Sequence, residues 1–396
     1  MRSNYSKQAG GVSIFIVIFS ALLITIVTVS FVSLMIRNQI QSSNADLSQS
    51  AYDSAMAGVE DAKRLMLVHR SCQDGSNTDV VLCTRVAEAM HAESDGWTAC
   101  NTLQRGLYGA GASVTTEYTI RRTEAGSIGD AALNQAYTCV KIRYNTEDIE
   151  KTAKDGEATV IPVDTNGQSY DTIRLSWFRR AAGSTNNLGG GPIDLPSRAS
   201  WDPAGTPDIP PIMRFQFIQV GASFNLGDFD STNSTSTVFY KPSSVITLPN
   251  ANLSQLALDN NRTQNGLTPK TVNCSSSQYT GGGYACSVDI MLPSTPRTSA
   301  YINIGAIYKD TDYKIELFNG GATGTKVKLA GVQPEVDATG RANDLFRRVS
   351  ARVEFNGNFT YPDATLRLTG NLCKDFRVTD QPGDYDPSNS TPECSP

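Results

Sequence analysis

Residues 12–36 contain no charged side chain and consist mainly of apolar residues with a few Ser and Thr. As an α-helix this run is about 37 Å long at 1.5 Å per residue, which is enough to cross the hydrocarbon core of a bilayer. The sequence therefore predicts a transmembrane helix over residues 12–36. Each remaining segment of the chain must then lie on one side of the membrane or the other.

The flanks of the span predict that it is a retained anchor. A cleaved secretory peptide has a shorter apolar region followed by a small-residue cleavage site, and no such site follows this span. Arg2 and Lys7 precede the span, whereas Arg37 and then Asp46 follow it. Because basic residues favour the cytoplasmic side, we expect residues 1–11 to form a short cytoplasmic leader and the large C-terminal part to be exported.

The eight cysteines independently indicate export. Their even number and the absence of two-residue spacing favour disulfides over a metal site. The first group admits three pairings, which the sequence leaves open. We expect the second group to close a glycine-rich hairpin and the third to close a Pro- and Asp-rich tail. The three groups are Cys72, Cys83, Cys100 and Cys139; Cys274 and Cys286; and Cys373 and Cys394.

Residues 37–70 continue the helical pattern beyond the span. They contain no Pro and one Gly, and small or apolar residues recur at three- and four-residue spacing. The pattern predicts an amphipathic extension of the transmembrane helix, whose apolar stripe packs either on its own domain or between subunits. The stripe consists of Ala45, Tyr52, Ala55, Val59, Ala62 and Met66.

The chain after Arg70 is polar and rich in turn residues, and alternating runs within it predict strands. Short helical stretches are expected near residues 84–91 and near Ala131. The predicted fold class is therefore α+β, with one long transmembrane and amphipathic helix followed by a β-rich, sandwich-like exported region. The predicted strands are residues 137–144, 172–178, 213–220, 284–291, 300–308, 313–317, 348–355 and 364–368.

A chain of 396 residues exceeds one ordinary domain, so two globular units are expected. Residues 181–211 are rich in Gly and Pro and predict a linker or long loop between them. The expected organisation is a first α/β part over 71–180 with four cysteines, the linker, a β-sandwich-like domain over 212–376 and a disulfide-closed tail over 377–396.

The sequence offers few groups for catalysis or metal binding. It contains only two histidines and has no nucleophile elbow, zinc-protease pair or phosphate-binding loop with lysine. A formal charge of −5 without a basic stripe argues against nucleic acid as a partner. Asp228 and Asp230 offer oxygen ligands for calcium, but without the Gly and terminal Glu of a helix-loop-helix site they are better explained as solvated turn residues. We therefore expect no enzyme activity, cofactor or metal.

The first 70 residues resemble a type IV pilin precursor. The resemblance is carried by a short basic leader that ends in Gln8-Ala9-Gly10-Gly11, by the long apolar helix and by its amphipathic extension. It implies that a prepilin peptidase cuts after Gly10 or Gly11, which makes Gly11 or Val12 the new N-terminus. It also implies that mature subunits pack their helices into a filament core.

The chain departs from the usual pilin pattern at the fifth mature residue. Pilins carry a glutamate there, whereas this chain has Phe15 or Ile16. A carboxylate inside a bilayer needs a partner, which in pilins is the N-terminus of a neighbouring subunit. A chain without it is similar to the atypical large minor pilins and to the tip pseudopilins of type II secretion. Residues 346–355 and the pair Cys373 and Cys394 resemble the late Arg-rich strand and the disulfide-closed terminal loop of such pilins.

The resemblance implies a minor or tip subunit of a filament at the cell surface. Its expected partners are the membrane, other pilin subunits, the prepilin peptidase and a surface ligand or host cell. The alternative is a signal-anchored surface adhesin or binding module outside any filament, for which no cut at Gly10 or Gly11 is expected. Small and hydroxylated residues in the span either serve helix contacts or bond to their own helix carbonyls. They are Ser20, Ala21, Thr25, Thr28, Ser30 and Ser33.

Overall fold

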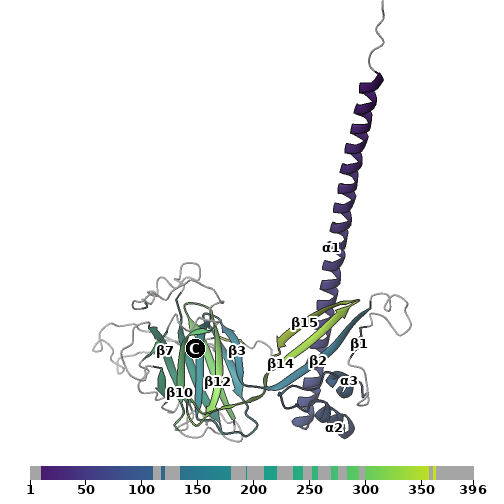
Figure 1. Ribbon diagram of the computed structural model, residues 1–396. Coiled ribbons are helices and arrows are strands. Elements are labelled where there is room, and N and C mark those ends of the chain that lie inside the picture. The colour runs from purple at the N-terminus through teal and green to yellow at the C-terminus, as the bar shows by residue number, and fades with distance from the viewer. Residues whose placement is uncertain are drawn as a thin grey trace, which may run out of the picture. The chain divides into compact units, whose positions relative to one another are not determined.

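The computed structural model describes residues 10–109, 117–120, 134–179, 193, 209–220, 235–243, 252–256, 269–274, 283–293, 299–355 and 360–362. The fold class is α+β, as predicted, because one long N-terminal helix precedes a β-rich region with several sheets (Figure 1). The chain divides into two compact units, which are described separately.

The helices of the described residues are α1 (Gly10–Gln73), α2 (Val80–Ala89) and α3 (Thr102–Gly106). Helix α1 is continuous because its segment contains no proline and, after the first turn, only one glycine, Gly58. The predicted transmembrane span and its amphipathic extension therefore form a single element. Helix α2 includes most of the helical stretch predicted near residues 84–91. The stretch predicted near Ala131 lies outside the described residues.

The connection from α1 to α2 is short, and a glycine and a capping aspartate fix its conformation. Gly75 has a φ of 76°, a left-handed conformation that glycine adopts without steric cost and that lets the chain reverse. The Asp79 carboxylate then accepts a hydrogen bond from the backbone N–H of Leu82 at 3.0 Å and caps the first turn of α2.

The β-strands follow in chain order. They are β1 (Tyr118–Thr119), β2 (Gln135–Thr146), β3 (Asp148–Ala153), β4 (Glu157–Val163), β5 (Thr172–Arg179), β6 (Ile212–Val220), β7 (Thr235–Ser243), β8 (Leu253–Gln255), β9 (Lys270–Asn273), β10 (Tyr284–Met291), β11 (Ser299–Ile307), β12 (Thr311–Asn319), β13 (Thr325–Val327), β14 (Leu329–Ala342), β15 (Leu345–Arg352) and β16 (Thr360–Pro362).

Most of the predicted runs coincide with these strands. The six runs predicted from residue 137 to residue 317 fall in β2, β5, β6, β10, β11 and β12. The run predicted at 348–355 is displaced by three residues, because β15 begins at Leu345 and ends at Arg352. Strand β14 was not predicted, because Gly331, Pro334 and Gly340 interrupt its alternation. The run at 364–368, the tail at 377–396 and most of the linker at 181–211 lie outside the described residues.

Unit 1 comprises Met1–Ile149, Asp164–Gln168 and Lys326–Gly357. Its sheet has the order β1-β2-β14-β15, with antiparallel pairing throughout. The C-terminal part of α1 lies across this sheet, and α2 and α3 lie near its C-terminal end (Figure 1). The core between these elements is apolar. It includes Val59, Leu65, Met66, Val86, Leu103, Tyr137, Val140, Ile142, Val336 and Ala338.

Unit 2 comprises Glu150–Val163, Ser169–Thr325 and Asn358–Pro396. Two six-stranded sheets form it, one in the order β13-β12-β5-β10-β8 with β3 beside β12, the other in the order β16-β4-β11-β6-β7-β9. Alternate side chains of both sheets are buried, such as Leu175 in β5 and Phe215 in β6. The buried Tyr240 hydroxyl of β7 donates to the Ser254 hydroxyl of β8 at 3.2 Å and so joins the two sheets. The arrangement is sandwich-like.

The division into units differs from the linear one expected over 71–180 and 212–376. Strand β2 pairs with β14 in antiparallel register, with Ile142 opposite Val336, although the two strands are far apart in the chain. Most of unit 2 is therefore inserted between two neighbouring strands of unit 1. Alternation in a sequence identifies the buried face of a strand but not its partner, so this pairing carried no local signal.

Candidate membrane-anchor and assembly helix

The N-terminal half of α1 exposes its apolar side chains from Ile14 onward. Each residue from Ile14 to Asp46 is exposed, including Phe15 and Phe19, which are both 73% exposed. The helix is long and apolar enough to cross a membrane. Apolar area of this extent is unfavourable in water, so residues 14–36 need a cover of lipid or of other helices.

Four hydroxyl groups inside the span donate to carbonyls of their own helix. Ser20 donates to the carbonyl of Val17 at 3.0 Å, and Thr25 donates to that of Leu22 at 2.8 Å. Thr28 and Ser30 make the corresponding bonds at 2.7 and 2.8 Å. These side chains can therefore enter lipid without an unpaired donor. These bonds are compatible with a helix that lies alone in the membrane. In contacts between helices, the residues would contribute through their small size, because their hydroxyl donors are already used.

The residues predicted for processing lie at the beginning of α1. The helix starts at Gly10, so Gly10, Gly11 and Val12 belong to its first turn. That turn contains no acidic residue, and the predicted fifth mature positions, Phe15 and Ile16, are exposed and apolar. A cut after either glycine would leave the helix essentially at full length.

The C-terminal half of α1 packs on the sheet of unit 1. Ala55, Val59, Ala62 and Met66 are buried, as the predicted stripe required, and this half therefore packs on its own domain. The other two stripe positions do not take part, because Ala45 and Tyr52 are exposed. The stripe prediction was wrong at Ala45 because burial of the helix begins only at about residue 47. It was wrong at Tyr52 because the buried face at that turn is formed by Ala51 and Ala55, and Tyr52 lies on the exposed face.

Small residues allow the helix and the sheet to approach closely. A Cβ atom added at Gly340 of β14 would collide with the backbone of Ala51 and Ala55. A Cβ added at Gly58 would lie 2.9 Å from the Cγ2 atom of Val140 in β2. Gly340 is therefore required by the close approach of two backbones and Gly58 by the packing of the Val140 side chain on the helix, and neither has a left-handed φ.

One carboxylate of α1 and three tyrosines form a cluster that holds the helix against the rest of unit 1. Asp61 Oδ2 accepts hydrogen bonds from the hydroxyls of Tyr137 at 3.0 Å and Tyr108 at 3.1 Å. The Tyr118 ring stacks between the other two rings, with centroids 4.7 and 5.2 Å away. Burial, reinforced by the Asp61 charge, raises the pKa of both Tyr137 and Tyr108, so both phenols stay protonated donors. Sequence reasoning missed this cluster, whose members are dispersed along the chain.

The Arg-rich strand β15 adds a further tie to the helix. Arg347 Nε donates to the Ser48 hydroxyl of α1 at 2.8 Å. Arg352 forms ion pairs with Asp148 at 2.7 Å and with Glu335 at 2.8 Å. Two of the basic groups of this strand therefore serve contacts within unit 1, while Phe346 beside them is 53% exposed.

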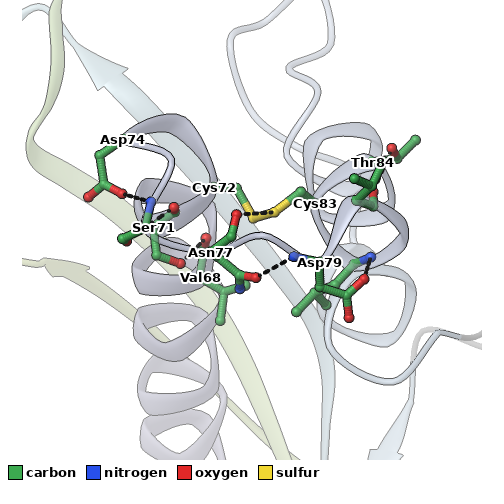
Figure 2. The surroundings of a disulfide bond; sticks show 11 residues. Val68, Ser71, Cys72, Asp74, Asn77, Asp79, Cys83 and Thr84 are labelled. Carbon is green, nitrogen blue, oxygen red and sulfur yellow. Dashed lines mark hydrogen bonds between the residues drawn. A yellow bond between two sulfur atoms is a disulfide. The ribbon is translucent and has the colours of Figure 1, made fainter.

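Two disulfides brace unit 1. Cys72 pairs with Cys83 and joins the last turn of α1 to α2, with Asn77 and Asp79 in the connecting segment (Figure 2). The Asn77 side-chain oxygen accepts from the backbone N–H of Asp79 at 3.0 Å, which holds this segment in place. Cys100 pairs with Cys139 of β2. The three pairings that the sequence left open are thus reduced to one.

The third disulfide joins Cys274 to Cys286. Cys274 follows β9 of one sheet of unit 2, and Cys286 lies in β10 of the other. The two cysteines are also partners in an isolated antiparallel bridge, so the bond joins the ends of the segment, as expected, and in addition links the two sheets. Within the described residues no cysteine is free, and Cys373 and Cys394 lie outside them. The disulfides indicate an oxidising environment and hence an exported region.

The structure describes no candidate metal centre. Among the described residues, no group of three or more His, Cys, Asp or Glu side chains is placed to hold a metal ion, and Asp228 and Asp230 lie outside those residues. Comparison with known proteins adds no relative: no family model, no curated protein and no solved structure matches the chain.

Proposed function

We propose that this chain is a structural subunit of a type IV pilus-like filament, in a minor or tip position, and that it presents units 1 and 2 at the cell surface. The observation that supports the proposal best is the division of one continuous helix into a fully exposed apolar half and a half fastened to its own domain. Residues 14–36 offer a long apolar surface that lipid can cover before assembly and neighbouring helices afterwards.

The rigid connection of that surface to unit 1 also supports the proposal. Because α1 continues unbroken into the sheet contact, a helix held in a filament core would fix the position of unit 1 at the filament surface. The packing at Gly340 and the Asp61 cluster both oppose independent movement of helix and sheet. A flexible tether would have been sufficient for a simple membrane attachment.

The absence of a glutamate at Phe15 or Ile16 supports a minor or tip position. Such a subunit lacks the charge pair that would recruit it beneath an existing subunit, so it should be scarce in filaments. Quantitative proteomics of purified filaments measures this, and abundance near that of the major subunit would contradict the tip position.

The second candidate function is a surface adhesin or binding module with a lone anchor. The bonds of Ser20, Thr25, Thr28 and Ser30 to their own helix carbonyls favour it, because these groups need no neighbouring helix. Mass spectrometry of the mature N-terminus separates the two functions. The filament proposal expects Gly11 or Val12 as the first residue, whereas an N-terminus upstream of both supports the lone anchor.

A replacement of residues 12–36 by polyleucine of equal length tests assembly directly. Polyleucine keeps the apolar length but removes the small residues that let helices approach closely. We expect the variant to reach the membrane and expose its disulfide-bonded units but to be lost from sheared filaments. A matched control replaces only Leu22 and Leu23 by isoleucine and should remain in filaments. Wild-type recovery of the polyleucine variant in filaments would favour the lone anchor.

A further inference from the structure

A polar pocket of about 660 Å³ lies in unit 1, at the C-terminal end of α1. Its wall includes both histidines of the chain, His69 on the last turns of α1 and His91 just after α2. Strand β2, the beginning of β14 and the 164–166 turn complete the wall. The volume is within the range of about 300–1,000 Å³ that is typical of small-molecule sites.

His69 supplies a neutral polar group in this pocket. Its ring is half-buried and lies edge-on to the Tyr144 ring, with centroids 5.1 Å apart. Burial lowers the pKa of His69, so at neutral pH the imidazole carries one donor and one acceptor. Within the part of the chain that the structure describes, neither ring nitrogen has a hydrogen-bond partner.

Four more polar side chains of the wall also lack a partner among the described residues. They are His91, Asn145, Asn166 and Lys328. The Asp164 carboxylate accepts from the backbone N–H of Asn166 through Oδ1 at 2.9 Å, and its Oδ2 has no partner among the described residues. By contrast, arginines of the neighbouring strand β15 pair with carboxylates of their own unit. The pocket therefore gathers unpaired donors and acceptors, which water or a ligand must satisfy.

The floor of the pocket has the opposite character. The pocket lining also includes Met90 and Ile142, which are buried and which we take as the floor, and the half-buried Ala330 adds a further apolar contact. A ligand that fits must therefore present many hydroxyl-like groups toward the rim and some C–H surface toward the floor. One lysine and one carboxylate on the same wall nearly balance in charge, which disfavours a phosphate or a metal ion as the main ligand.

We propose that this pocket binds a saccharide of one or two sugar units. Amide, imidazole and carboxylate groups can each pair with sugar hydroxyls as donor or acceptor, and the apolar floor suits a sugar C–H face. The site does not depend on filament assembly. His69 lies more than 30 residues beyond the span on the same helix, about 50 Å at 1.5 Å per residue, so a lone anchor would present it as well.

The test uses the full chain in micelles of an amine oxide detergent, which has no sugar headgroup. The labelled protein is applied to an array of defined mono- and disaccharides, and each hit is titrated by isothermal calorimetry. The variants Lys328→Ala and Asn145→Ala remove polar groups of the wall that are exposed, so the fold should survive. Lys326→Ala is the matched control, because Lys326 lies two residues away and outside the pocket wall.

We expect saturable binding of at least one saccharide, weakened roughly tenfold by each wall variant, as the loss of one or two hydrogen bonds implies, and changed less than about twofold by the control. Binding that Lys328→Ala and Asn145→Ala leave unchanged would place the sugar elsewhere and overturn the proposal. Failure of every array sugar to bind at millimolar concentration would overturn it as well. Neither result bears on N-terminal processing, which tests the filament proposal separately.

Discussion

Two halves of helix α1 share one backbone conformation but have opposite environments. In residues 14–46 each side chain is exposed, whereas in residues 51–66 a regular stripe is covered by the sheet. Phe15 is 73% exposed, and Leu65 is fully buried. Helical periodicity is common to both halves, so the difference lies in what covers them. The apolar face of the packed half is buried within unit 1, whereas the apolar surface of the exposed half is buried only when lipid or other helices cover it.

The residue types at the contact explain why the sheet covers only one half. Ala51, Ala55, Gly58 and Ala62 present a low ridge, on which β14 and β2 can lie almost against the helix backbone. The exposed half presents Phe, Ile and Leu around its whole circumference. A helix that is apolar on all sides fits a membrane or a helical bundle. Four predictions test this comparison, from the largest expected effect to the smallest.

Gly340→Val should have the largest effect, because its side chain would collide with the backbone of Ala51 and Ala55. Backbone cannot move aside as a flexible side chain can, so we expect a loss on the order of 5 kcal/mol, enough to unfold unit 1. Hydrogen exchange of the full chain in micelles, read peptide by peptide, measures this loss. Ala21→Val in the exposed half is the control and should leave exchange in unit 1 unchanged. Normal protection in Gly340→Val would refute the close contact.

Replacing both Cys100 and Cys139 by Ser should have the next largest effect. The bond closes a loop with a sequence separation of 39, for which the chain-entropy model gives about 4 kcal/mol. The corresponding pair of substitutions at Cys72 and Cys83 opens a loop with a separation of 11 and should cost about 3 kcal/mol. Chemical denaturation of the full chain measures both. A larger loss from the shorter loop would contradict this order.

Leu65→Ala tests the packed half without removing a covalent bond. Leu65 is fully buried, and its truncation should lower the free energy of unfolding by about 2–5 kcal/mol. Leu67, two residues later, is 47% exposed and is the matched control, for which we expect a change of about 0.5 kcal/mol or less. Equal losses in the two variants would mean that Leu65 does not lie on the buried face of α1.

The sequence predicted the features that depend on local pattern. The uncharged run of residues 12–36 and the spacing of Ala55, Val59, Ala62 and Met66 were sufficient to predict α1 and its buried face. The insertion of unit 2 between β2 and β14 was not predictable, because strand pairing depends on global topology. The pairing of Cys274 with Cys286 was predictable, but its role as a link between two sheets was not.

The candidate sites divide in the same way. The exposed half of α1 could be predicted because a membrane helix is a property of one segment. The cluster of Asp61 with Tyr108 and Tyr137, and the pocket that holds His69 and His91, were not predictable from spacing. In each case the fold brings together residues from α1 and from strands or loops far along the chain. The residue types and their local spacing did not indicate that these residues are in contact.

His69 should give the smallest effect, because only its protonation changes. Burial lowers its pKa in the folded state, so on acidification the unfolded chain takes up the proton first. The stabilising contribution is therefore present above the ordinary histidine value of 6.5 and is lost as the pH falls through the lowered folded-state value. Since the ring is only half-buried, we expect less than about 1 kcal/mol between pH 7 and pH 5.

His69→Gln should flatten this part of the stability curve, because glutamine keeps a polar side chain of similar reach that does not titrate. His91→Gln is the matched control, since it replaces the other histidine of the same pocket and His91 is exposed. Thermal unfolding of the full chain in micelles across this pH range provides the measurement. If His69→Gln kept the full acid sensitivity while His91→Gln lost it, the histidine at the α1 end would not be the buried one, and the packed half of the helix would end earlier than residue 69.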